Sequence, residues 1–223
     1  MTEPQISVRS LLRETFATTG SLYAPLLIIY SPRFIFLAAF NSFDSRDLAT
    51  FAFSIIYLLV AGPWWSGAMI FYIYRSLTRN QVTVGEAFNQ ANRRLLQLIG
   101  VSVTYWVQVW VCGMLIIPGL YVAYRLMFSL YATVIDNSSA KDSISSSWAL
   151  TEWRGWLVFL APFLIFFVVF VPQPLIVQLI SSTGNLLASK LVGNVLGFLA
   201  GPLIDVYFVL LYLRLRESAA TIE

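Results

Sequence analysis

Long apolar runs alternate with short polar segments along this chain. A helix of about 20 apolar residues is long enough to span the ~30 Å hydrocarbon core of a membrane. Runs of this kind, some of them interrupted, lie at residues 21–40, 48–74, 98–117, 120–135, 155–180 and 191–213. The pattern predicts an all-α, polytopic integral membrane protein with about six transmembrane helices.

Proline and glycine interrupt several of these runs. The third and fourth runs meet at Ile116-Ile117-Pro118-Gly119. This join is too short for any connection other than a tight turn, so the two runs are expected to form a helical hairpin. Gly62-Pro63 and Gly201-Pro202 lie in the middle of the second and sixth runs. Such a pair frees backbone carbonyls, which either accept hydrogen bonds from neighbouring helices at a simple kink or bind substrate, as in broken transporter helices. The kink is the favoured interpretation.

Basic residues are sorted by side of the membrane. Six crossings would put both termini on one side. Ten of the 14 lysines and arginines lie on that side: Arg9, Arg13, Arg75, Arg79, Arg93, Arg94, Lys141, Arg154, Arg214 and Arg216. Only Arg46 and Lys190 lie on the other side. The positive-inside rule therefore predicts a protein of the bacterial cytoplasmic (inner) membrane with both termini in the cytoplasm.

Three polar segments on the predicted cytoplasmic side align without gaps: Ser7-Val-Arg-Ser10-Leu-Leu-Arg, Thr83-Val-Gly-Glu86-Ala-Phe-Asn and Ser139-Ala-Lys-Asp142-Ser-Ile-Ser. Each begins with a hydroxyl residue suited to a helix N-cap. The second and third have an acid three residues later, as in a capping box. Apolar residues follow at helical spacing, most weakly in the serine-rich third segment. The segments predict three amphipathic helices that lie at the membrane surface.

These helices predict an internal repeat within a single membrane domain. Gly62-Pro63 precedes Arg75 by the same spacing that separates Gly201-Pro202 from Arg214. Three parallel repeats follow, at residues 1–80, 81–136 and 137–223, each with an amphipathic helix and a helical hairpin. The alternative is that inner-membrane loops commonly contain short amphipathic helices without any repeat.

Composition supports the membrane assignment and narrows the chemistry. Hydrophobic residues make up 58% of the chain and charged residues 11%, against roughly 45–50% and a quarter in soluble domains. The chain has no histidine and one cysteine, Cys112. These counts exclude histidine-based catalysis, histidine-ligated metals and intrachain disulfides. No phosphate-binding glycine loop or metal-ligand motif is found, so we expect no enzyme activity, cofactor or metal. Asp136, Asp142 and Glu152 share one predicted loop, as helix caps or, alternatively, as a divalent-metal site.

The net charge of +3 has a membrane explanation. The basic residues flank apolar runs, which favours contact with anionic lipid head groups over nucleic acid. The candidate lipid contacts are Arg75, Arg79, Arg93 and Arg94.

Three ionisable residues lie inside apolar runs: Arg33, Arg125 and Asp205. Each costs about 2.5–3.5 kcal/mol near the centre of a membrane helix, so partners or water are expected. The simplest interpretation is a structural ion pair between Arg125 and Asp205. The alternatives are a net positive pocket for a lipid phosphate or an anionic solute, and snorkelling of Arg33 towards the outer surface.

Several motifs in the second half of the chain resemble a known group of proteins. They are Ile117-Pro-Gly-Leu-Tyr-Val-Ala-Tyr-Arg-Leu126, Ala132-Thr-Val-Ile-Asp136, Ser147-Trp-Ala-Leu-Thr151 and Tyr212-Leu-Arg-Leu-Arg-Glu217. They resemble the membrane domain of bacterial glycerophosphoryl diester phosphodiesterases and the YciC-type inner-membrane proteins. Ser145-Ser146-Ser147 is more polar than that pattern, and Arg33 and Asp205 have no place in it. The phosphodiesterase chemistry belongs to a separate soluble barrel with histidine and carboxylate ligands, so the resemblance implies a membrane layout without catalysis.

The sequence thus predicts a non-enzymatic integral membrane protein that organises the membrane or binds lipids and other membrane proteins. The alternative is a transporter or channel for a small anionic or amphiphilic solute, centred on Arg33, Arg125 and Asp205.

Overall fold

The computed structural model describes residues 8–40, 48–78, 82–152, 160, 164–165, 167, 171–182, 184 and 186–220. This part of the chain is helical and contains no strand. Its elements are α1 (Val8–Phe40), α2 (Leu48–Ile56), the π-helical turn η1 (Tyr57–Ala61), α3 (Gly62–Leu77), α4 (Val84–Arg93), α5 (Leu95–Gly113), α6 (Ile116–Leu126), α7 (Ser129–Ile135), α8 (Ala140–Glu152), α10 (Pro172–Ser181) and α11 (Leu186–Ala220).

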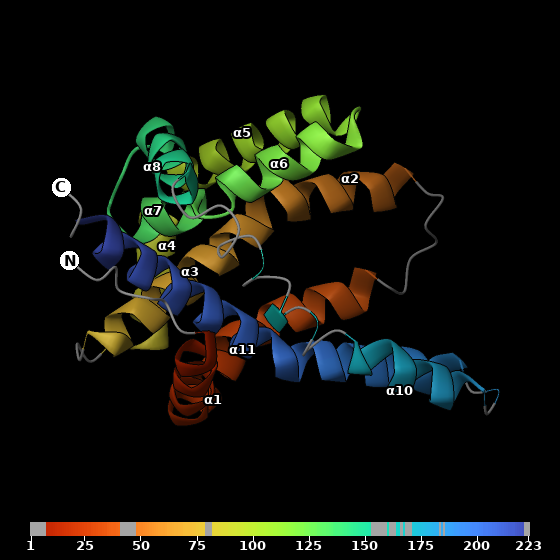
Figure 1. Ribbon diagram of the computed structural model, residues 1–223. Coiled ribbons are helices and arrows are strands. Elements are labelled where there is room, and N and C mark those ends of the chain that lie inside the picture. The colour runs from red at the N-terminus through yellow and green to blue at the C-terminus, as the bar shows by residue number, and fades with distance from the viewer. Residues whose placement is uncertain are drawn as a thin grey trace.

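The two longest helices, α1 and α11, pack along each other, and α10 lies beside α11 (Figure 1). The helix formed by α2, η1 and α3 contacts both α1 and the α5–α6 hairpin. The short helices α4, α7 and α8 cluster at one end of the molecule (Figure 1). Arg214 of α11 donates to Ser10 at 2.9 Å and pairs with Glu14, so the start of α1 lies beside the end of α11.

Three helices are long and apolar enough to cross a membrane: Thr50–Leu77, Leu95–Gly113 and Leu191–Ala220. They correspond to the second, third and sixth predicted runs, so the membrane assignment is supported for this part of the chain. Large apolar side chains are exposed on α5, in the turn that follows it and on α10. Trp110, Met114 and Leu179 are 74%, 90% and 73% exposed. Exposed apolar surface of this extent is typical of a face that contacts lipid.

The other predicted crossings differ from expectation or remain predictions. The fourth run, 120–135, is not one helix, because the chain turns at Met127 and Phe128 between α6 and α7. The 11 residues of α6 extend only about 16 Å, too short for the hydrocarbon core. Most of the first half of the fifth run, 155–180, lies outside the described residues. Six crossings are therefore not confirmed.

The first predicted surface helix and the first run form one helix, α1, of 33 residues. Its first turns run at an angle to the remainder (Figure 1). Pro25 and Pro32 lie inside α1, and a proline within a helix removes a backbone hydrogen bond and favours a bend. The predicted boundary between a surface helix and a span is thus a bend within one helix.

The predicted hairpin is confirmed for α5 and α6, which pack against each other. Its turn lies at Met114 and Leu115, two residues earlier than expected. Pro118 fits the first turn of α6 because its fixed φ is helical and no N–H is needed there. A Cβ at Gly119 would lie 2.6 Å from the Cα of Gly113, so these glycines allow the close approach of the two helices.

Two of the predicted caps are confirmed. Thr83 and Glu86 form a capping box at α4: the Thr83 N–H donates to Glu86 Oε2 at 2.8 Å, and the Glu86 N–H donates to Thr83 Oγ1 at 3.3 Å. The bond from the Thr83 backbone N–H holds the pKa of Glu86 below its ordinary value. At α8 the Asp142 N–H donates to Ser139 Oγ at 3.3 Å. Ser7, the third predicted cap, lies outside the described residues.

The three polar segments nevertheless adopt different structures. α4 buries the expected apolar face, with Ala87 and Ala91 against α3. The start of α1 buries Leu11 of its expected face but leaves Phe16 54% exposed. In α8 the buried stripe consists of hydroxyl residues, Ser143, Ser147 and Thr151, which face α6 and α7. The proposed repeats therefore remain a prediction.

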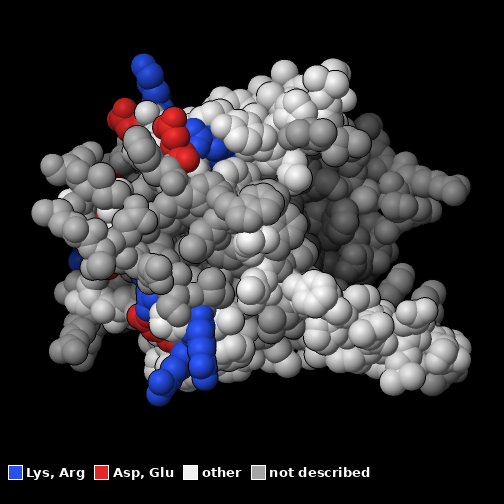
Figure 2. All heavy atoms as spheres, viewed as in Figure 1, with Lys and Arg blue, Asp and Glu red and all other residues white. Residues whose placement is uncertain are grey.

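Charge is concentrated at one end of the molecule. Figure 2 shows the described acidic and basic side chains at the end where α4 and α8 lie. The opposite end, with the tips of α2, α10 and the α5–α6 hairpin, shows no charged side chain among the described residues on this face.

Candidate functional site

Arg33 of α1 and Asp205 of α11 line one cavity of about 350 Å³ between the helices. Six hydroxyl side chains share its wall: Tyr57, Ser66, Ser102, Tyr105, Ser129 and Tyr131. The apolar part of the wall includes Trp106, Leu126 and Phe208. The cavity therefore combines two opposite charges, hydroxyl groups and aromatic faces.

The cavity lies near the middle of the helices of membrane length. Gly62 lies near the midpoint of Thr50–Leu77, Ser102 near that of Leu95–Gly113, and Asp205 near that of Leu191–Ala220. Polar groups at this depth are the costliest to bury in hydrocarbon, so each of them needs a partner within the protein.

A break in one helix shapes this wall. The Gly62 N–H donates to the carbonyl of Tyr57, five residues back, which makes η1 a π-helical turn. Pro63 has no N–H. The carbonyl of Leu58 is therefore left without a donor at either position in its own helix. Ser102 Oγ of α5 donates to this carbonyl at 3.2 Å, so the kink interpretation of Gly62-Pro63 holds, with a neighbouring helix supplying the missing hydrogen bond.

Gly201-Pro202 plays a different part. It lies within continuous α-helix, and a Cβ at Gly201 would lie 2.3 Å from Tyr30 Cζ. The missing side chain thus leaves space for the Tyr30 ring between α1 and α11. The Arg33 guanidinium lies over this ring, with Cζ 4.9 Å from its centroid. Gly201 therefore helps to position Arg33.

Arg33 and Asp205 do not form an ion pair within 4.0 Å, as far as the described residues show. Arg33 Nε is buried without a hydrogen-bond partner among them. A second, much smaller space of about 10 Å³ is lined by both charged residues together with Tyr30, Trp65 and Ser66. Because Arg33 faces these internal spaces, snorkelling to the outer surface does not describe its position.

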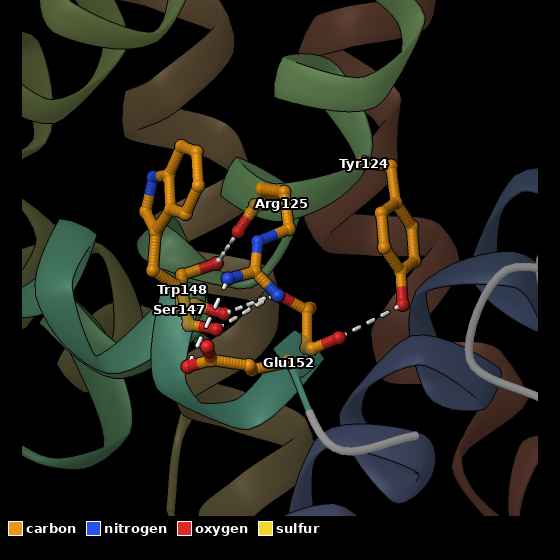
Figure 3. A network of polar contacts seen from close by, with 6 residues as sticks. Tyr124, Arg125, Ser147, Trp148 and Glu152 are labelled. Carbon is orange, nitrogen blue, oxygen red and sulfur yellow. Dashed lines mark hydrogen bonds and ion pairs between the residues drawn. The ribbon is translucent and has the colours of Figure 1, made fainter. Parts of the chain in front are cut away.

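Arg125 lies elsewhere, and its predicted pairing with Asp205 is wrong. Figure 3 shows its guanidinium between Trp148 and Glu152 of α8. Its Cζ is 4.6 Å from the Trp148 ring centroid, and its Nη2 is 4.0 Å from Glu152 Oε2. The centroid of the Tyr121 ring, which belongs to the same helix as Arg125, lies 5.7 Å from Arg125 Cζ. The charge is thus held by aromatic faces and by one exposed carboxylate.

Ser147 closes the break between α6 and α7 (Figure 3). Its Oγ accepts from the Phe128 N–H at 3.2 Å and donates to the Arg125 carbonyl at 2.7 Å. The Tyr124 hydroxyl donates to the Thr151 carbonyl at 3.2 Å, one turn further along α8. Ser147, one member of the hydroxyl stripe of α8, therefore supplies hydrogen bonds where the helical ladder is interrupted.

The four candidate lipid-contact arginines do not form a single cluster among the described residues. Arg75 and Arg93 are exposed and line a groove of about 430 Å³ between α3 and α4, called here the basic groove. Its other lining residues are Phe71, Val82, Glu86, Asn89 and Gln90. Arg94 instead donates from Nη1 to the Thr133 carbonyl at 2.9 Å, which ties the α4–α5 corner to α7. Arg79 lies outside the described residues.

The carboxylates of the predicted loop have separate partners. Asp136 accepts from the Tyr212 hydroxyl and pairs with Arg216 at 3.0 Å. The Asp142 carboxylate accepts from the Ser139 hydroxyl at 2.6 Å at the start of α8, and Glu152 pairs with Arg125. Within the described residues, no group of three histidine, cysteine or carboxylate side chains is placed to hold a metal ion.

No protein family, curated protein or solved structure matches the chain in comparisons of sequence and fold.

Replacing Ser147 with alanine is expected to lower the free energy of unfolding by about 1–3 kcal/mol, because the buried Phe128 N–H and Arg125 carbonyl each lose a partner. SDS titration of the detergent-solubilised protein measures this. The control is Ser145→Ala, which removes an exposed hydroxyl from the same helix. Equal effects of the two substitutions would contradict the bridging role of Ser147.

Proposed function

We propose that this chain is a non-enzymatic, multi-pass protein of the bacterial cytoplasmic membrane that binds anionic lipid head groups on its charged end. The observation that carries the proposal is the basic groove beside helices of membrane length. We propose membrane lipids and other membrane proteins as the partners of this chain. The motif resemblance in the second half of the chain is consistent with this layout.

The groove offers the chemistry that a phosphate needs. Arg75 and Arg93 approach it from two different helices, and the amides of Asn89 and Gln90 add neutral donors. Glu86 also lines it, but its carboxylate accepts the Thr83 N–H of the capping box. One net positive charge remains among these side chains. A basic residue near an anionic surface contributes about 1 kcal/mol, and arginine also offers paired donors to phosphate oxygens.

The charge distribution supports the proposed orientation. Ten of the 14 basic residues flank the apolar runs on the side of the two termini. The described members of this set lie at the charged end, where anionic lipids of the cytoplasmic leaflet would meet them. Both termini are accordingly proposed to be cytoplasmic.

Arg75→Gln combined with Arg93→Gln should reduce phosphatidylglycerol retention about tenfold or more, as expected for two lost contacts. Native mass spectrometry of the detergent-extracted protein measures the bound lipid. The matched control is Arg9→Gln with Arg13→Gln, which removes the same charge from exposed positions on α1. Equal retention by the two double variants would contradict a lipid site in the groove.

A second candidate function is transport of a small amphiphilic or anionic solute. The cavity near the middle of the membrane-length helices favours it, since Arg33 and Asp205 both line that cavity. Proteoliposomes should take up radiolabelled hexanoyl lysophosphatidylethanolamine faster than protein-free liposomes, and Arg33→Gln with Asp205→Asn should remove the difference. Uptake that this double variant leaves unchanged would contradict transport through the cavity.

A further inference from the structure

We infer that the cavity between Arg33 and Asp205 binds a small zwitterion, a group that carries one acidic and one ammonium centre. The inference rests on the second candidate function and narrows its substrate class. It concerns binding at equilibrium, and so it is tested separately from uptake and from the basic groove.

The charges on the cavity wall balance each other. The sequence alone allowed two arginines against one aspartate, a net positive pocket suited to an anion. The structure places Arg125 against Trp148 and Glu152 instead. Among the described lining residues, one arginine and one aspartate remain on the cavity wall. A ligand with a single net charge would leave one of these two side chains without a counter-charge at mid-membrane depth, which is costly.

The two charged side chains do not pair directly with each other. Arg33 and Asp205 line the same cavity, but their side-chain nitrogen and oxygen atoms do not lie within 4.0 Å of each other, so neither charge is neutralised by direct contact with the other. Arg33 Nε has no hydrogen-bond partner among the described residues and is buried. A phosphate or carboxylate placed at Arg33 would accept from this N–H and from the neighbouring guanidinium donors.

The wall near Asp205 suits an ammonium group. Asp205 supplies the counter-charge, and the rings of Tyr105, Tyr131 and Phe208 line the same cavity. An ammonium group is attracted both by a carboxylate and by the face of an aromatic ring. The hydroxyls of Ser66 and Ser129 offer further acceptors.

The volume of the cavity limits the size of the ligand. A volume of about 350 Å³ lies at the low end of the ~300–1,000 Å³ found for small-molecule pockets. It accommodates a polar head group or a small solute but not a whole two-chain lipid. The phosphoethanolamine head of a phospholipid and the free solute glycerophosphoethanolamine have the required chemistry, because each is a phosphodiester with one negative charge beside one ammonium group.

The rival account is a structural pair without a ligand. The space of about 10 Å³ between Arg33, Asp205 and their neighbours is close to the size of one water molecule. Such a water could join the two side chains and satisfy both. In that case the charges would stabilise the helix packing and would select no ligand.

The test compares three probes in detergent: dihexanoyl phosphatidylethanolamine, dihexanoyl phosphatidylglycerol and free glycerophosphoethanolamine. Native mass spectrometry titration gives the affinity of each, and thermal unfolding is recorded with and without probe. The wild-type chain should bind the zwitterionic lipid about tenfold more tightly than the anionic one. Tight binding of free glycerophosphoethanolamine as well would identify the head group alone as the ligand, and binding of the lipid only would identify an amphiphile. Both results support the inference.

Two variants assign the two centres. Asp205→Asn should reverse the preference towards phosphatidylglycerol, because Arg33 is then the only charged side chain among the described lining residues. Arg33→Gln should weaken binding of both lipids about tenfold. The control is Asp142→Asn, which makes the same charge change at an exposed helix cap and should alter neither affinity. Wild-type binding that favours the anionic lipid, or is absent for all three probes, would overturn the inference. So would variants that lower the unfolding temperature without changing the preference, as a water-linked structural pair predicts.

Discussion

Hydrogen bonding of backbone groups in the middle of apolar helices is the constraint on which the rest of this structure depends. In hydrocarbon, an unsatisfied carbonyl or N–H costs several kcal/mol, and water is absent. The helix from Leu48 to Leu77 is interrupted by η1 and Pro63, which leaves the Leu58 carbonyl free until Ser102 donates to it. The break between α6 and α7 is closed in the same way by Ser147. At both breaks a serine from another helix supplies the missing partner.

These two breaks also shape the interior. The turn at η1 and the chain at Met127 and Ser129 both line the cavity that holds Arg33 and Asp205. If these helices were continuous and straight, their side chains would pack against each other and fill the region that the cavity occupies. The interrupted ones leave space there, with hydroxyls around it. The remaining described charges lie mainly at one end, where Arg214 and Arg216 join α11 to Glu14 and Asp136. The molecule thus separates a charged end, an apolar exterior and a small polar interior.

Much of the architecture could be predicted from the sequence, because the signals are local or depend on composition. The lengths of the apolar runs predicted three helices that the structure supports as membrane-length. Thr83 with Glu86 and Ser139 with Asp142 predicted two helix starts. Arg33 and Asp205 were recognised as unusual from their apolar neighbours alone. The partner of Arg125 could not be derived this way, because depth estimated along straight helices ignores the turn at Met127. The packing face of α8 was missed because apolar periodicity does not register a stripe of hydroxyls.

The most direct test of this account is a double-mutant cycle between Ser102 and Pro63, measured as the free energy of unfolding in SDS titrations. Ser102→Ala in the wild-type chain should cost about 1–2 kcal/mol, because the Leu58 carbonyl loses its donor. In a Pro63→Ala background the new N–H at position 63 can donate to that carbonyl, so Ser102→Ala should cost less than about half as much. An equal cost in both backgrounds would show that Ser102 does not compensate for the break, and would contradict the account.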